Sequence, residues 1–133
     1  SEMCIRDSLQ VDGTYPVELF PDILDHLRSA QHNEYQEWDH DYAGFSRTAQ
    51  EEGFPEIAHI FSMIAGIEKT HGDRFGKFAE LLEQDKLFVS DVQVKWMCLN
   101  CGQIIDATMA PAVCPVCKHP QGYFIRWEMA PFE

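Results

Sequence analysis

Apolar residues recur every three or four positions between residues 21 and 52, and this spacing predicts a helix. Its shared face carries Leu27, Ala30, Glu34, Glu37, Asp41, Phe45 and Ala49. Gly53 ends the pattern, and Pro55 stands where the first residue of a second helix is expected. The second helix should reach Gln84, with an inner stripe of Ile57, Ile60, Phe61, Ile64, Ile67, Glu68, His71, Phe75, Phe78 and Leu82. Because the turn between them is so short, the two helices should run antiparallel.

The periodicity changes after Asp85. Residues 92–96 alternate as a strand does, and residues 123–125 form a second short strand candidate. We therefore expect a mainly α protein with a small β part. Residues 21–87 would form an antiparallel helical hairpin, and residues 88–133 a small module of strands and loops. Residues 1–20 are irregular, and their first eight resemble a translated adapter, so we expect a partly non-native leader there.

Four of the five cysteines fall within this small module as a doubled C-x-x-C pattern. Cys98 and Cys101 form the first pair, and Cys114 and Cys117 the second, with Gly102 permitting a positive φ after the first pair. In each pair, two thiolates can coordinate one ion from a tight turn whose backbone N–H groups point at the sulfurs. The pattern predicts a tetrahedral metal site. Iron and zinc both suit four thiolates, so the spacing leaves the metal open.

Two further pairs of chemically active residues lie on the predicted helices. Glu34 and Glu37 are three residues apart on the first helix, and Glu68 and His71 on the second, so each pair projects side by side. An inward Glu-x-x-His is the unit with which ferritin-like bundles hold iron. Chance on an acidic helix is the alternative. The register favours metal, because both pairs continue apolar stripes and a buried unpaired carboxylate costs several kcal/mol. Tyr42 would either hydrogen-bond a ligand carboxylate or serve as a core tyrosine.

The charge balance excludes some partners. Against 10 basic residues the chain has 22 acidic ones, a formal net charge of −12, which argues against nucleic acid and anionic membranes. No run of 18 apolar residues exists, so we expect no membrane span. We also expect no secretory signal, which favours a reducing cytoplasm and metal ligands over disulfides. The excess acid is either a solvated surface or, in part, a set of carboxylates that bind metal.

Together these residues resemble rubrerythrin between Leu27 and Glu128. The matching segments are Asn33-Glu34-Tyr-Gln-Glu37-Trp38, Tyr42-Ala-Gly-Phe45, Ala49-Gln-Glu-Glu-Gly-Phe-Pro-Glu-Ile-Ala58, Ile67-Glu68-Lys-Thr-His71, Lys95-Trp-Met-Cys98-Leu-Asn-Cys101-Gly102 and Cys114-Pro-Val-Cys117-Lys-His-Pro-Gln-Gly-Tyr-Phe124. The resemblance implies half of a ferritin-like four-helix bundle followed by a rubredoxin-like module. Neither zinc ribbons nor ferritins carry both halves in this order.

The resemblance also implies an activity: a non-haem iron peroxidase that reduces hydrogen peroxide. Electrons from NAD(P)H, delivered by a redox donor protein or reductase, would pass through an Fe(Cys)4 centre to a di-iron centre, within a homodimer. Glu34, Glu37, Glu68 and His71 would be di-iron ligands, with Tyr42 beside them, and the four cysteines would hold iron. The alternative is an electron-transfer or structural module in which only the four-cysteine site holds iron or zinc.

One departure from the family concerns the start of the chain. The family's bundle has two earlier helices that supply a further Glu and another Glu-x-x-His, but only 26 residues precede Leu27, and they contain no such pattern. We favour a chain that lacks its first half, which the unusual leader supports. Alternatively, two hairpins pair about a two-fold axis and rebuild the bundle, each supplying Glu34, Glu37, Glu68 and His71.

Overall fold

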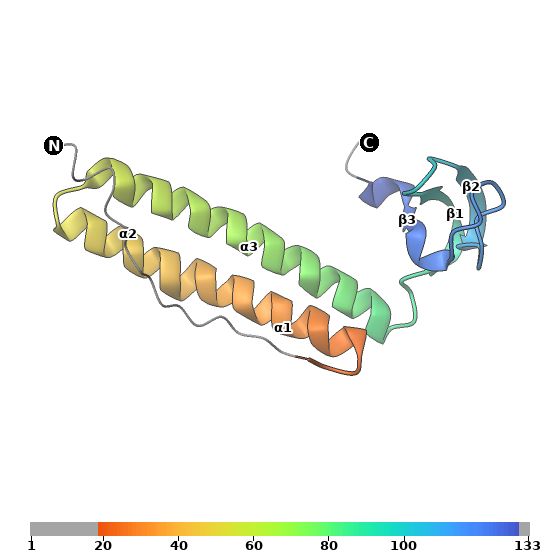
Figure 1. Cartoon of the computed structure of the whole chain (residues 1–133), viewed down its shortest axis with the longest axis horizontal. Coiled ribbons are helices and arrows are strands. Elements are labelled where there is room, and N and C mark those ends of the chain that lie inside the picture. The colour runs from red at the N-terminus through yellow and green to blue at the C-terminus, as the bar shows by residue number, and fades with distance from the viewer. Residues whose placement is uncertain (1–18, 131–133) are drawn as a thin grey trace, which may run out of the picture.

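A computed structural model describes residues 19–130 of the chain. Its elements are α1 (Ile23–Gln36), the π-helical segment η2 (Glu37–Asp41), α2 (Tyr42–Glu51), α3 (Pro55–Glu83), β1 (Val89–Cys98), β2 (Ile104–Met109), the 3-10 turn η3 (Gln121–Tyr123), β3 (Phe124–Arg126) and the 3-10 turn η4 (Trp127–Met129). Figure 1 shows α1 and α2 end to end beside the long α3, with the strands beyond the C-terminal end of α3. The predicted class, a helical hairpin followed by a small β module, is confirmed. The expectations about residues 1–18 lie outside the described residues.

Local signals in the sequence set the ends of the helices. The Asp22 side chain accepts a hydrogen bond of 2.8 Å from the backbone N–H of Leu24 and caps α1. Gly53 has a φ of +86°, which permits the turn after α2, and Pro55 is the first residue of α3. At the open end of the hairpin, the Arg28 guanidinium forms an ion pair of 2.6 Å with Glu83. These contacts hold the antiparallel arrangement that the short turn predicts.

The first predicted helix contains an interruption that its apolar spacing does not reveal. In η2 the backbone N–H of Tyr42 bonds to the carbonyl of Glu37, five residues earlier. A π turn adds one residue to the helical turn and rotates every later side chain relative to the earlier ones. Phe45, which we predicted on the inner face, is 51% exposed, whereas Ala49 is 7% exposed.

The hairpin is packed through small residues of α3. The α3 residues buried in the structure are Ala58, Ala65, Gly72, Gly76, Ala79 and Leu81. The stripe that we predicted as inner is only partly enclosed. Three of its members are exposed, with exposed fractions of 46% for Ile57, 45% for Ile60 and 51% for Ile67. The other seven are half-buried: Phe61, Ile64, Glu68, His71, Phe75, Phe78 and Leu82. The prediction was wrong for these three isoleucines, because α3 has two apolar stripes. The helices approach closely through the stripe of small side chains, and the isoleucines lie on another side of α3.

The β module is a three-stranded antiparallel sheet in the order β2-β1-β3. Its core consists of Trp96, Cys98, Ala110, Cys114 and Phe124. Trp96 is fully buried in the central strand, and its indole N–H donates to the Ala107 carbonyl at 3.1 Å. The strand predicted at residues 92–96 lies within β1, and the one at 123–125 overlaps β3, whereas β2 was not predicted. The core is therefore built around two of the cysteines.

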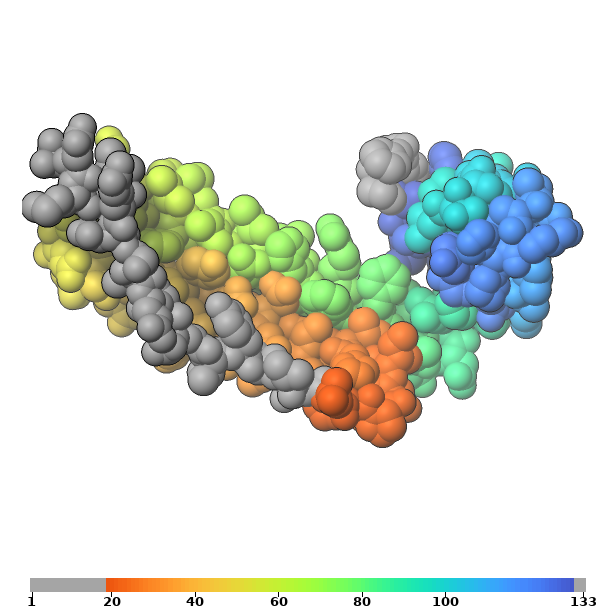
Figure 2. All heavy atoms as spheres, in the orientation of Figure 1, coloured from red at the N-terminus to blue at the C-terminus, as the bar shows by residue number. Residues whose placement is uncertain are grey.

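Arg126 joins the module to the segment that follows α3. Its guanidinium donates to the backbone carbonyls of Lys86 at 3.1 Å and Val89 at 2.6 Å. In Figure 2 the hairpin (orange to green) and the module (cyan to blue) form two lobes connected near the end of α3. Among the described residues, no helix combines the length and apolar character needed to cross a membrane.

Candidate metal centres

The two C-x-x-C pairs bring four sulfur atoms together in the β module. Cys98 is the last residue of β1, and Cys114 lies in the loop before η3. All four Sγ atoms lie within 4.8 Å of one another, with 3.6 Å between Cys98 and Cys117 and 3.7 Å between Cys101 and Cys114. The first turn is closed by the Gly102 N–H, which donates to the Cys98 carbonyl at 2.8 Å, with Gly102 at a φ of +77°. The positive φ predicted for Gly102 is confirmed.

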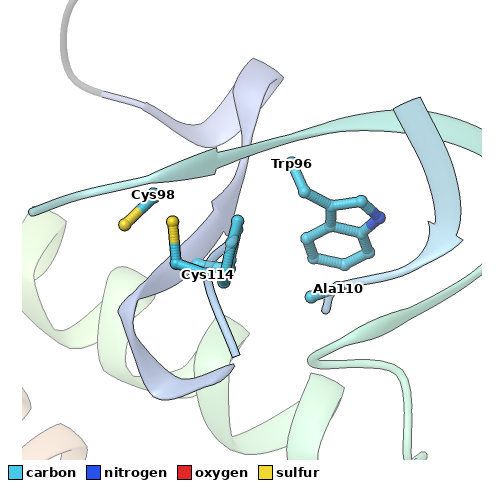
Figure 3. Close-up of a cluster of buried hydrophobic side chains, with 5 residues drawn as sticks. Trp96, Cys98, Ala110 and Cys114 are labelled. Carbon is cyan, nitrogen blue, oxygen red and sulfur yellow. The ribbon is translucent and has the colours of Figure 1, made fainter. Parts of the chain in front are cut away.

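This spacing fits a tetrahedral metal ion. Four sulfurs about 2.3 Å from one ion lie about 3.8 Å from each other, close to the separations in this cluster. In Figure 3 the Cys98 and Cys114 sulfurs lie near each other, with Trp96 farther along the same core. Cys98 and Cys114 are buried, whereas Cys101 is exposed. The four-cysteine site is therefore shielded by the core on one side and faces water on the other.

The thiols do not all ionise easily without a cation. A backbone hydrogen bond from His119 lowers the pKa of Cys117 to about 5. A backbone hydrogen bond from Gln103 also favours the Cys101 thiolate, but desolvation and the neighbouring thiols raise the pKa of Cys101 to about 12. One thiolate is thus readily formed, and its charge opposes the ionisation of the others. A bound cation would remove this opposition.

A second cluster lies inside the hairpin, where α1 faces α3. Glu34 comes from α1, Glu68 and His71 come from α3, and their ligand atoms all lie within 4.8 Å of one another. The His71 Nδ1 atom lies 2.8 Å from a Glu68 oxygen and 3.3 Å from a Glu34 oxygen. Donors bound to one first-row metal ion at about 2.0–2.2 Å lie about 3–3.5 Å apart, so this arrangement fits such an ion. The exposed fractions of these side chains are 23%, 14% and 42%.

The two carboxylates in this cluster are close enough to compete for a proton. Burial raises the pKa of Glu34, and a hydrogen bond with Glu68 raises it further, against the opposing charge of His71. Like charges held together in this way are stable when a proton or a metal ion lies between them. The predicted Glu-x-x-His unit and Glu34 therefore form one site. Their role as ligands stays a prediction.

Two other predicted site residues lie outside this cluster. Glu37 is the first residue of η2 and lines a surface pocket with Asn33, Gln36 and Asp41. Tyr42 packs in an aromatic group, its ring centroid 5.8 Å from that of Phe45 and 6.1 Å from that of Phe61. The geometry places Tyr42 in the hairpin's apolar packing, and the assignment of Glu37 as a ligand stays a prediction.

Tyr35 supports the helical cluster and was not singled out by the sequence. Its hydroxyl donates to Asp73 at 2.7 Å, and Lys69 donates to the other oxygen of that carboxylate at 2.7 Å. The Lys69 ammonium lowers the pKa of Asp73, and the Tyr35 hydroxyl lowers it further. The Tyr35 ring lies directly against the backbone of Gly72, next to His71. The signal available in the sequence was the pair Gly72 and Gly76, one turn apart inside a helix, which suggests close packing.

Comparison with known proteins gives consistent matches. The family model described as "Rubrerythrin" matches residues 5–94, and that described as "Rubrerythrin, rubredoxin-like domain" matches residues 96–125. The rubrerythrin of Clostridium perfringens is 44% identical over 118 residues, which are 89% of this chain and 60% of that protein. The rubrerythrin of Porphyromonas gingivalis is 37% identical over 116 residues, 87% of this chain and 58% of that protein.

Solved structures of nigerythrin are also similar. For the fully reduced, all-ferrous state the TM-score is 0.49 at 24% sequence identity, covering 95% of this chain and 58% of that chain. The chain thus spans about three fifths of the length of the curated relatives, 60% and 58% for the two above.

Proposed function

This chain belongs to the rubrerythrin family, and we propose that it serves in the reduction of hydrogen peroxide by a non-haem iron protein. The observation that carries the proposal is that one chain holds both a four-cysteine cluster and a Glu34-Glu68-His71 cluster. When bound, iron in the first site would relay single electrons, and a pair of ferrous ions in the second would supply the two electrons that cleave the O–O bond. With two protons, hydrogen peroxide then becomes two molecules of water.

The protein's own residues divide this work. The buried Trp96 and Phe124 keep water from one side of the four-cysteine site, while the exposed Cys101 offers an edge at which an electron donor can approach. We propose as donor a redox protein or an NAD(P)H-dependent reductase. In the hairpin, the 42% exposure of the His71 side chain leaves access for a substrate as small as peroxide and for protons from water. Because thiolate ligands persist in reducing compartments, we propose a cytoplasmic location.

A second candidate function is electron transfer or structural metal binding at the four-cysteine site alone. It is favoured by the ligand count, since Glu34, Glu68 and His71 are only three donors. In that case iron or zinc would bind with one ion per chain, and the hairpin would be a support.

The test compares the wild type with His71→Ala, both loaded anaerobically with ferrous iron. We expect more than one iron per wild-type chain, and rapid oxidation by hydrogen peroxide, faster than by oxygen. His71→Ala should keep the sulfur-to-iron charge-transfer bands of the four-cysteine site but lose the additional iron and the reaction with peroxide. A colourless protein with one zinc ion per chain, or equal peroxide reactivity in both proteins, would contradict the proposal.

A further inference from the structure

Tyr35 connects α1 to α3 beside the candidate metal ligands of the hairpin. It directly follows Glu34 in α1, and its hydroxyl donates a 2.7 Å hydrogen bond to Asp73, two residues after His71 in α3. The Tyr35 ring occupies the space that a side chain at Gly72 would need, since a Cβ placed there would lie 2.5 Å from two ring carbons. The ring and the hydroxyl together fix α1 against α3 at the level of the ligands.

Two further side chains complete a cycle of contacts around Tyr35. Lys69, one helical turn before Asp73, donates a 2.7 Å hydrogen bond to the second oxygen of the Asp73 carboxylate. The Lys69 ammonium also lies 5.3 Å from the centre of the Trp38 ring, and that ring meets Tyr35 edge-on with 5.8 Å between centroids. We call these four residues, two from each side of the hairpin, the Tyr35 cluster. Each contact is weak at a partly exposed site, but the cycle restricts where the Tyr35 hydroxyl can lie.

The spacing of α1 and α3 decides whether the three candidate ligands can meet. Within α3, a Glu68 oxygen lies 2.8 Å from the His71 Nδ1 atom, and the helix itself sets that separation. Glu34 comes from the other helix, and its oxygen lies 3.3 Å from the same nitrogen. Metal sites require ligand distances within about 0.2 Å of their usual values. A small shift of α1 against α3 would therefore remove Glu34 from the ligand set.

Without a metal ion, the ligands give this arrangement little support. Glu34 and Glu68 are both carboxylates, so their approach across the hairpin is repulsive unless a proton or a cation lies between them. A contact that does not involve the ligands would help to hold α1 against α3 at this level. The Tyr35 cluster provides such a contact, and the charge of Asp73 within it is paired with that of Lys69 at 2.7 Å.

We propose that Tyr35 and Asp73 are positioning residues, which hold Glu34 against Glu68 and His71 so that the helical site is formed before a metal ion binds. They act through the ligands and do not themselves bind the metal. The proposal rests on the proposed function in one respect, namely that these three residues are metal ligands. The competing explanation is that the Tyr35 cluster stabilises the hairpin as a whole and has no specific effect on the site.

The ion pair between Arg28 and Glu83 separates these two explanations. It joins the same two helices at 2.6 Å and is similarly exposed, with exposed fractions of 38% and 43% against 51% for Asp73. However, Arg28 lies six residues before Glu34, roughly 9 Å along the helix axis. Glu83 lies twelve residues after His71, roughly 18 Å along α3. Breaking this ion pair should loosen the hairpin but leave the ligands in place.

Anaerobic titration of the 133-residue chain with cobalt(II) tests the proposal, because the absorption bands of cobalt differ between thiolate ligands and oxygen or nitrogen ligands. We expect the wild type to bind cobalt both at the cysteines and at the helical site. Tyr35→Phe keeps the ring but lacks the hydroxyl, and it should weaken cobalt binding at the helical site by roughly 3–10-fold. Tyr35→Leu should weaken it by roughly 10–100-fold and change its absorption bands, because Glu34 would no longer reach the ion.

Two variants of Asp73 separate its hydrogen bond from its charge. Both Asp73→Asn and Asp73→Ala remove the charge, but only Asp73→Asn keeps an oxygen that can accept from Tyr35. Asp73→Asn should therefore bind cobalt at the helical site roughly threefold more tightly than Asp73→Ala. The matched control is Glu83→Gln, which should be less stable to urea than the wild type but bind cobalt equally well at both sites.

Unchanged cobalt binding at the helical site in Tyr35→Leu, or equal losses in Tyr35→Phe and Glu83→Gln, would overturn the positioning role. Equal binding by Asp73→Asn and Asp73→Ala would overturn it as well, and these two variants alter only an exposed side chain, so they decide the matter even if Tyr35→Leu does not fold. A wild type that binds cobalt at the cysteines alone would refute both the ligand assignment and the positioning role. If the variants behave as expected but the ferrous wild type does not react with peroxide, only the proposed function is wrong.

Discussion

At Gly72 of α3 the Tyr35 side chain of α1 approaches the helix backbone closely. Replacing Gly72 with alanine would therefore combine a gain in helix propensity with a steric clash. In the interior of a helix, Gly→Ala stabilises by about 0.8–1.0 kcal/mol. At Gly72, however, an added Cβ would lie 2.5 Å from two carbons of the Tyr35 ring and 3.4 Å from the Glu34 Cβ. The ring would have to move, because 2.5 Å is shorter than any ordinary contact between carbon atoms.

The magnitudes favour destabilisation. Overpacking of this kind costs about 1–3 kcal/mol. Displacing Tyr35 also weakens the 2.7 Å hydrogen bond to Asp73, worth about 0.5–1.5 kcal/mol. After the gain in helix propensity, Gly72→Ala should lower the free energy of unfolding by about 1–3 kcal/mol. Because Gly72 follows His71 and touches Glu34, metal affinity at the hairpin should fall as well.

Urea denaturation of the metal-free protein, followed by far-UV circular dichroism, measures the effect. The control is Gly66→Ala in the same helix, where an added Cβ meets nothing within 4 Å. It should raise the free energy of unfolding by about 0.8–1.0 kcal/mol. Adding Tyr35→Ala to Gly72→Ala should recover part of the loss by removing the obstructing ring. If Gly72→Ala stabilises the protein as much as Gly66→Ala does, the close packing at Gly72 is wrong.

Two further predictions concern the metal sites. Trp96→Ala should lower the free energy of unfolding by about 3–5 kcal/mol, because it leaves a cavity in the core of the β module. It should also speed the loss of metal to a chelator, because metal binding and folding are linked there. Trp96→Phe should have a smaller effect on both, and unchanged metal retention in Trp96→Ala would contradict the prediction. Burial and the hydrogen bond with Glu68 raise the pKa of Glu34 in the folded state, so the stabilisation from its bound proton is present at acid pH and lost as pH rises through the folded pKa. Without metal, Glu34→Gln should therefore be more stable than the wild type near neutral pH, and this difference should shrink as the pH falls. The variant should also bind less metal at the hairpin. Urea denaturation at several pH values measures the difference in stability, and a difference that grows toward acid pH would contradict the prediction.

The four-cysteine site could be predicted from the sequence because its geometry is local. Each C-x-x-C pair fixes two sulfurs within one turn, and Gly102 marks the positive φ that closes the first turn. The strand β2 between the pairs was missed for a physical reason. Its inward positions, Ile105 and Ala107, are only half-buried and one of them is small, so the alternation is weak.

The hairpin was harder to predict because spacing alone does not say which stripe faces which neighbour. Helix α3 carries large isoleucines on one stripe and Ala and Gly on another, and the larger residues were taken as the inner face. Close approach of α1 selects the small stripe instead, as the contact of Tyr35 with Gly72 shows. The π turn at η2 likewise could not be predicted from the spacing of apolar residues, because it depends on a shifted backbone hydrogen bond between Tyr42 and Glu37.

The exposed isoleucines of α3 affect how the helical metal site closes. The exposed stripe and the ligands share one side of α3, so any segment that buries Ile60 and Ile67 also encloses Glu68 and His71. Burial of apolar surface would favour that closure, while the carboxylates oppose it until a cation is bound. Metal binding and closure of the bundle should thus be one linked equilibrium, in which each strengthens the other. A hairpin with polar residues in place of these isoleucines would keep the same three ligands but would lack the apolar surface that drives their enclosure.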